Sequence, residues 1–292
     1  MEELSIAEGL PRMQALASRL WRPKSRHHPG QLAWSTAYAV PEELDHGPVA
    51  FVIADGVDIG WAWQEEPGWV ELCLDADHPD SHAAGRELVA WAAGADQVAT
   101  SVLETESHLI EPLRAAGFVA DWETPWFTHH HADLASLAEP SPAAGYTLRH
   151  VRPDEADARS ACHRGAWSPT SKVSEAAYSR LMATPPYRHE LDWVAVDEDD
   201  RMVASCLVWY DAGSGAALVE PVGCAPNHRR QGLAGAVSLA ALQAARRLGA
   251  TTGLVCPRGD DGYPVPARVY RGIGFEPGHR TVTLQRTVPG GG

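Results

Sequence analysis

The predicted order of strands and helices is repeated between the two halves of this 292-residue chain. In the second half, a hairpin around the acidic turn Asp197–Arg201 precedes an apolar strand, a long helix that stops at Gly249, another strand, a short helix and a last strand. The first half follows the same order, with a hairpin in residues 48–66 and a long helix over Ser81–Ala95. Because four elements correspond in sequence, we interpret the chain as a tandem duplication.

The repeat predicts two domains of the α+β class, each a mostly antiparallel mixed sheet flanked by helices. A stretch rich in proline and alanine, AEPSPAAG, occupies residues 138–145 and is typical of a linker. We therefore expect one domain over residues 1–140 and another over 141–292. The short helix of the second domain is expected to begin no earlier than Pro266, since proline is tolerated in a first turn, and the last strand to cover Arg280–Val288.

The composition indicates a globular protein and the compartment in which it is expected. Hydrophobic residues make up 45% and charged residues 21% of the chain, as in soluble globular proteins. No apolar run approaches the roughly 18 residues of a transmembrane helix, and the acidic start lacks the layout of a secretory signal. Five scattered cysteines without a C-x-x-C pair favour reduced thiols over a disulfide framework or a zinc site. We expect a cytoplasmic protein with no membrane partner.

The net charge of −14 is concentrated in the first half. Residues 1–140 hold 7 Lys and Arg against 23 Asp and Glu, whereas residues 141–292 hold 17 against 15. Binding of nucleic-acid phosphates requires a basic face, so no nucleic-acid partner is expected for the first half. A small polyanionic ligand fits the second half better.

A basic, glycine-bearing turn, RRQGLA at residues 229–234, lies between an apolar strand and the longest predicted helix. The first N–H groups of a helix have no internal partner, and the helix dipole places partial positive charge there. Gly232 and Ala234 leave room for a diphosphate to approach the backbone, and two arginines can add charge at the rim. The turn therefore predicts an anion site.

With this turn in its context, residues 146–288 resemble the GNAT superfamily of acyl-CoA N-acyltransferases. The likeness rests on VEPVGCAPNHRRQGLAGAVSLAALQAARRLGA and ARVYRGIGFEPG. The first half resembles a degenerate GNAT copy, as in tandem proteins of the mycothiol synthase type. The resemblance implies acyl-CoA as co-substrate, no metal, and a binding surface for its pyrophosphate and pantetheine made by Val222, Gly223, Cys224, Arg229, Arg230, Gln231, Gly232, Leu233 and Ala234.

The first half does not reproduce this turn. Its corresponding segment, DSHAAGREL, lacks the required glycine spacing, and Asp75, Asp77 and Asp80 would repel a pyrophosphate. We therefore expect one CoA site, in the second half, while the first half supports the fold or shapes the acceptor pocket.

The resemblance also implies catalytic residues. Glu220, three residues before Gly223, matches the position of an acidic residue that often acts as base, directly or through a water. Tyr270 matches the tyrosine that often protonates the leaving thiolate, and its phenol, with an ordinary pKa of about 10, is a donor at neutral pH. Tyr263 replaces an asparagine common in the family, so one wall of the donor tunnel differs and acyl groups larger than acetyl stay open.

Other residues are candidates for acceptor binding, metal binding or a covalent relay. The segments where the family builds its acceptor pocket offer five candidates, which are His163, Trp167, Ser168, Tyr178 and Tyr187. Three consecutive histidines, His129–His131, cannot all converge on a metal from one strand, because adjacent side chains point to opposite faces. Cys224 is expected to be a small packing residue rather than a covalent relay.

The sequence thus predicts an acyltransferase of class EC 2.3.1. It would move an acetyl or other small acyl group from acyl-CoA to the amine of a small molecule, by direct attack in a ternary complex. Two alternatives stay open: a donor carried on the phosphopantetheine arm of an acyl carrier protein, and a non-catalytic CoA-binding protein. The acceptor, the acyl group and the oligomeric state are not fixed by the sequence.

Overall fold

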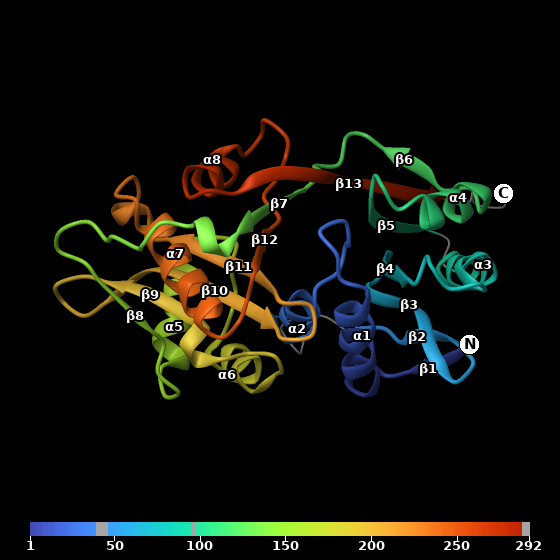
Figure 1. The fold of residues 1–292 in the computed structure, drawn as a ribbon, viewed down its shortest axis with the longest axis horizontal. Coiled ribbons are helices and arrows are strands. Elements are labelled where there is room, and N and C mark those ends of the chain that lie inside the picture. The colour runs from blue at the N-terminus through green and yellow to red at the C-terminus, as the bar shows by residue number, and fades with distance from the viewer. Residues whose placement is uncertain (39–45, 95–96, 288–292) are drawn as a thin grey trace.

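The computed structural model describes residues 1–38, 46–94 and 97–287 (Figure 1). Ala95 and Val288, where one helix and the last strand were predicted to end, lie outside the described residues. The first half contains β1 Glu2–Leu4, α1 Ile6–Leu20, α2 Pro29–Tyr38, β2 Val49–Ala54, β3 Val57–Glu66, β4 Trp69–Leu74, α3 Ser81–Ala92, β5 Gln97–Leu103, α4 Ser107–Ala115, β6 Val119–Asp121, β7 Thr128–Asp133 and a 3-10 turn, Leu134–Ser136.

The second half repeats the order of strands and helices. It contains β8 Thr147–His150, α5 Ala156–Ala166, α6 Glu175–Ala183, β9 Asp192–Val196, β10 Met202–Asp211, β11 Ala216–Cys224, α7 Leu233–Arg247, β12 Thr252–Val255, α8 Val265–Gly272 and β13 Glu276–Thr287, with 3-10 turns at His189–Leu191 and Pro226–His228. The predicted mixed sheet flanked by helices is confirmed. Helix α8 begins one residue before Pro266, and β13 begins four residues before Arg280.

The strands of both halves join into one sheet of order β1-β2-β3-β4-β5-β13-β7-β12-β11-β10-β9-β8, with β6 paired to β13. The junction is made by strand exchange. Strand β7 of the first half pairs with β12 of the second, and the end of β13 pairs with β5 and β6 of the first. Figure 1 shows β13 running from beside α8 across to β5 and β6. Each half therefore completes the other, and a domain boundary near residue 140 stays a prediction.

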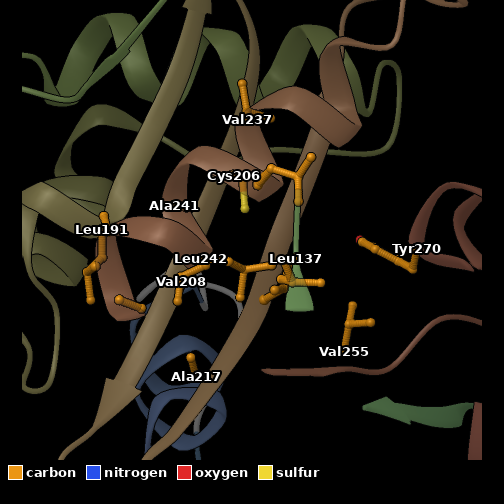
Figure 2. Packing of buried hydrophobic residues seen from close by; sticks show 14 of the residues in the cluster. Leu137, Leu191, Cys206, Val208, Ala217, Val237, Ala241, Leu242, Val255 and Tyr270 are labelled. Atoms are coloured by element: carbon orange, nitrogen blue, oxygen red, sulfur yellow. The ribbon is translucent and has the colours of Figure 1, made fainter. Parts of the chain in front are cut away.

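Both faces of the sheet of the second half are buried, and successive side chains of a strand alternate between them. Cys206 and Val208 pack with α7 in one cluster, whereas Leu207 and Trp209 pack with α6 on the opposite face. Helix α7, rich in alanine and leucine, lies closely against β10 and β11 (Figure 2). Burial of each leucine here stabilises the fold by about 1.5–3 kcal/mol.

Helix α2 belongs to the first half by sequence but packs on the second. Its Ala33 and Ala37 join the cluster that contains Trp209 and Tyr178. Gly30 lies against the indole of Trp209, where an added Cβ would stand 2.1 Å from the nearest side-chain atom. The α6-side face of β10 and β11 is therefore covered in part by the first half, together with the chain that leads into α2.

Candidate active site

Strands β11 and β12 are parallel neighbours for three residues and then separate. Ala216 to Leu218 pair with Thr252 to Leu254, after which β11 continues to Cys224 with β10 as its strand partner. On the side facing β12, the segment from Val219 to Cys224 has no strand partner within the described part of the chain. Such an edge can hydrogen-bond an extended amide-bearing arm as if it were another strand.

Glu220 lies at the point where the two strands separate. A register shift between β10 and β11 places Glu220 and Pro221 opposite Leu207, and the indole N–H of Trp209 donates to the Glu220 carbonyl at 2.7 Å. Burial raises the pKa of the Glu220 carboxyl to about 7, and the positive charge of Arg26 partly offsets this rise. A carboxyl with a pKa near neutrality is well suited to accept a proton at physiological pH.

Tyr270 extends from α8 toward the core residues around Leu242 (Figure 2). The ring is 7% exposed, and burial raises the pKa of its phenol well above the ordinary value, with the charge of Glu220 acting in the same direction. The phenol therefore stays protonated at neutral pH and can donate. Because the charge of Glu220 reaches Tyr270, the structure brings the two predicted catalytic residues to one region.

The predicted anion turn has an open backbone. Gly232 is the N-cap of α7 with φ +75° and no side-chain cap, and the first helical bond runs from the Ala236 N–H to the Gly232 carbonyl. No atom lies within 4 Å of the Cβ position at Gly232. The N–H groups of the first turn, from Leu233 onward, are thus oriented to receive an anion.

The side chains of the turn divide into two groups. Arg229 donates from Nε to the Cys224 carbonyl at 3.1 Å and from Nη2 to the Ala166 carbonyl at 3.0 Å, which ties the end of β11 to α5. Gln231 donates to the Tyr146 hydroxyl at 3.0 Å. These two residues hold the turn in shape. Arg230 is exposed and forms no ion pair within the described residues, so it is the arginine available at the rim.

Two of the five predicted acceptor residues, Trp167 and His163, lie at the end of β11. The ring of Trp167 lies over Gly223, where an added Cβ would be 2.2 Å away from it. Trp167 stacks on His163 with ring centroids 4.3 Å apart, and burial lowers the pKa of His163 to about 3, which keeps it neutral. Ser168 follows on the exposed surface.

The other two predicted acceptor residues, Tyr178 and Tyr187, lie in a buried cluster. Their hydroxyls donate to Asp192 at 2.5 Å and 3.1 Å, and Asp192 also pairs with Arg159 at 2.9 Å. Tyr178 is 0% exposed. The structure therefore places Tyr178 in the packed interior, where its hydroxyl satisfies a buried carboxylate.

Residues of the first half reach this region and were not predicted from the sequence. Arg26, in the chain leading into α2, lies within electrostatic reach of Glu220, Glu71 and Glu106. A signal was present, since WVEL at residues 69–72 resembles LVEP at 218–221 in the duplicated pattern. The repeat thus places Glu71 at the position that Glu220 occupies in the second half.

Three further features of the described residues concern metal binding, cavities and membrane insertion. His129 and His130 are both buried on β7, and no group of three or more His, Cys, Asp or Glu residues in the described ranges could hold a metal ion. A cavity of about 390 Å³, bordered by Thr184 to Arg188 and Tyr210 to Ala212, lies at the opposite end of β11 from Gly223. Of the helices in residues 1–38, 46–94 and 97–287, none is long and apolar enough to cross a membrane.

Comparison with known proteins agrees with this architecture. Residues 156–275 match the model of the Acetyltransferase (GNAT) family. No curated protein sequence matches the chain. A tandem GNAT protein from the clavulanic acid biosynthesis pathway is 19% identical, with 99% of this chain and 98% of that chain covered and a TM-score of 0.66.

Two further solved structures share the fold. A GCN5-related N-acetyltransferase from Sphaerobacter thermophilus is 17% identical, with 99% of this chain and 96% of that chain covered and a TM-score of 0.60. One from Kribbella flavida is 21% identical, with 90% and 96% covered and a TM-score of 0.56. The tandem arrangement of two folds of this type is confirmed, and the family match supports acyl transfer as the general chemistry.

Proposed function

Starting from a chain made of two GNAT folds, of which the second matches the GNAT family, we propose that the second half transfers an acetyl or other small acyl group from acyl-CoA to an amine of a small molecule. The observation that carries the proposal is the open turn before α7 leading to the unpaired edge of β11. The turn would hold the pyrophosphate, and the edge from Val222 to Cys224 would bind the pantetheine amides.

The separation of β11 and β12 lets donor and acceptor meet from opposite faces. Tyr270 belongs to the cluster on the α7 and α8 face, whereas Trp167 and the chain before α2 approach from the other face. The acyl donor would enter from the α7 side, with its thioester in the gap. The acceptor would reach the gap from the side of α5 and α2.

The residues at the gap account for each proton in the transfer. Glu220 would take a proton from the acceptor ammonium, directly or through a water, and the free amine would attack the thioester carbonyl. A β11 N–H near Val222 would polarise that carbonyl. When the tetrahedral intermediate collapses, the C–S bond breaks and Tyr270 would protonate the departing thiolate. The second proton leaves the attacking nitrogen at this step and would restore the Tyr270 phenol. The products are an amide and free CoA.

The described part of the first half would not hold an equivalent donor. Asp80 occupies the N-cap position of α3 without a side-chain cap, and Asp75 and Asp77 lie in the loop that precedes it. Asp75 pairs with Arg19 at 2.8 Å, but Asp77 and Asp80 form no ion pair with Lys or Arg among the described residues. A pyrophosphate there would meet like charge.

A matched pair of glycine variants tests the donor site. Gly232 and Gly56 both have φ between +75° and +78° and no atom within 4 Å of the Cβ position, but Gly56 lies in a hairpin of the first half. Gly232→Asp places a carboxylate at the turn and is expected to weaken CoA binding more than about 100-fold by calorimetry, because charge repulsion adds to lost contacts. Gly56→Asp should leave binding unchanged.

The outcomes separate the three readings of the site. Equal CoA binding by the two variants would remove the turn from the proposal. If the wild-type protein acylates amines only from a loaded acyl carrier protein, the donor is the carrier protein's thioester and not acyl-CoA. Tight CoA binding without turnover on any amine, together with no effect of Glu220→Gln, would favour a non-catalytic binding protein.

A further inference from the structure

The junction between the two halves gathers carboxylates around one guanidinium. Glu71 is 2% exposed and accepts from the Trp69 indole N–H at 2.9 Å, while its Oε1 lies 3.4 Å from Nη2 of Arg26. The charge of Arg26 also reaches Glu65 and Glu106 of the first half and Glu220 of the second. Among the described residues, four carboxyl groups therefore lie within the electrostatic reach of Arg26, and Glu71 is the one that pairs with it.

The duplicated fold explains why these groups meet. Glu71 stands two residues beyond Trp69, which pairs with Ala99 of β5, and Glu220 stands two residues beyond Leu218, the last residue of β11 paired with β12. Both carboxylates thus project where a parallel strand pair separates. The exchange of β7 and β13 joins the two sheets edge to edge, which brings both points within reach of Arg26.

The positive charge at this junction is smaller than the negative charge. Glu71 is the carboxylate that pairs with Arg26, whereas Glu65, Glu106 and Glu220 form no ion pair within residues 1–38, 46–94 and 97–287. All three are partly exposed. Burial raises the pKa of each of the three carboxyls to about 7, so each is ready to ionise when a cation approaches.

Three buried atoms at the same place have no hydrogen-bond partner among the described residues, namely the donor Nε of Arg26 and two atoms that can accept. Oε2 of Glu71 has none, since the nearest ring nitrogen, Nε2 of His27, is 3.7 Å away and bonds instead to the Leu72 carbonyl. His129, 1% exposed, leaves its Nδ1 unpaired. Burial lowers the pKa of His129 well below its ordinary value, and the positive charge of Arg26 acts in the same direction, so the ring is neutral and lies within electrostatic reach of Arg26. A carboxylate oxygen and a neutral imidazole nitrogen can both accept from an ammonium N–H.

We propose that this junction binds a second cationic group of the acceptor, so that the acceptor is a diamine or a larger polyamine with one nitrogen at Glu220 and another among Glu65 and Glu106. The inference rests on the proposed function and names its substrate class. Arg26, held by Glu71, fixes the inner wall of this second position. The first half thus contributes acceptor specificity in place of a second donor site.

The sign of the pH dependence follows from the raised pKa values. Below about pH 7 the carboxyls of Glu65 and Glu106 are mostly protonated and attract a cation weakly, and above it they are ionised. Affinity for a diamine should therefore rise between pH 6 and pH 8. Binding at pH 7 should release protons, because the bound cation lowers both pKa values.

Calorimetry on the full chain, saturated with CoA, tests the proposal with spermidine and butylamine as probes. We expect spermidine to bind at least about tenfold more tightly than butylamine, with proton release. Glu106→Gln and Glu65→Gln should each weaken spermidine binding about tenfold and leave butylamine unchanged. Glutamine keeps an acceptor for the Leu103 N–H that now bonds to Glu106. Glu87→Gln, on the exposed face of α3, is the control and should change nothing.

The failures of the two proposals differ. Equal binding of the two probes, no binding of spermidine, or unchanged spermidine binding by both variants would overturn the second cationic position, even if CoA binds and butylamine is acylated. Absence of CoA binding would instead overturn the proposed function. In turnover, Glu106→Gln should raise the KM for spermidine with little change in kcat. A purely structural defect would instead lower kcat for both amines and the thermal stability of the protein.

Discussion

Replacement of Glu220 by glutamine should separate catalysis from stability. The carboxyl has a pKa of about 7 in the folded chain against an ordinary value of 4.5, because it is buried. The folded protein thus prefers the protonated form. That preference contributes stability fully below pH 4.5, and the contribution is lost as the pH rises through 7.

The size of the effect follows from the two pKa values. A pKa difference of one between the folded and unfolded states corresponds to about 1.4 kcal/mol, so ionised Glu220 lowers the free energy of unfolding by at most about 3.5 kcal/mol above pH 7. Since the side chain is partly exposed, we expect about 1–3 kcal/mol. Glu220→Gln should therefore raise the Tm by roughly 2–8 °C at pH 8 and leave it unchanged at pH 4.5.

The same variant should lose activity. Removal of a general base lowers kcat/KM by about 10²–10⁴-fold, and the wild-type kcat/KM should fall about tenfold per pH unit below 7. Thermal unfolding at both pH values and steady-state kinetics across pH 5.5–8.5 provide the test, with Glu87→Gln as an exposed control. A variant that retains the wild-type pH profile, or is destabilised equally at pH 4.5 and 8, would refute the reasoning.

Three further variants test other parts of the site. Tyr270→Phe should lower kcat about 10–100-fold without changing CoA affinity, as measured by kinetics and calorimetry; unchanged kcat would remove the phenol from the reaction. Asp192→Asn breaks a pair with Arg159 in which both side chains are 0% exposed, so urea unfolding should show a loss of about 3–5 kcal/mol, and a loss under 1 kcal/mol would contradict a structural role. Gly223→Ala should weaken CoA binding because its Cβ meets the Trp167 ring, and Trp167→Leu should restore part of it; additive losses would argue against this contact.

Local sequence patterns were sufficient for most elements of the fold. The apolar runs of β10 and β11, the alanine-rich α7 and the glycine at its start are each encoded within a few neighbouring residues. The αL conformation of Gly232 and the φ of +107° at Gly249 agree with the predicted start and stop of α7.

The choice of strand partners could not be predicted in this way. β7 and β13 have ordinary strand patterns, and nothing local states that each completes the sheet of the other half. For the same reason, the place of Glu71 at the junction of the two halves could not be predicted. Its match to Glu220 is visible in the sequence, but its proximity to Arg26 and Glu220 depends on how two distant sheets join.

The predicted acceptor residues also differ in how far local sequence places them. Trp167 and His163 were predicted to line the acceptor pocket, and in the structure Trp167 lies over Gly223 and stacks on His163. Tyr178 and Tyr187 were predicted from the same part of the sequence, yet their hydroxyls donate hydrogen bonds to Asp192. A buried carboxylate 14 residues from Tyr178 gives no periodic signal, so this pairing required the structure.

A crystal structure of the protein with bound CoA tests the central claim most directly. We expect the pyrophosphate oxygens within hydrogen-bonding distance of main-chain N–H groups at residues 231–234, and the sulfur in the gap between β11 and β12, close to Glu220 and Tyr270. A nucleotide at the start of α3, or a pantetheine arm that does not follow the free edge of β11, would contradict it.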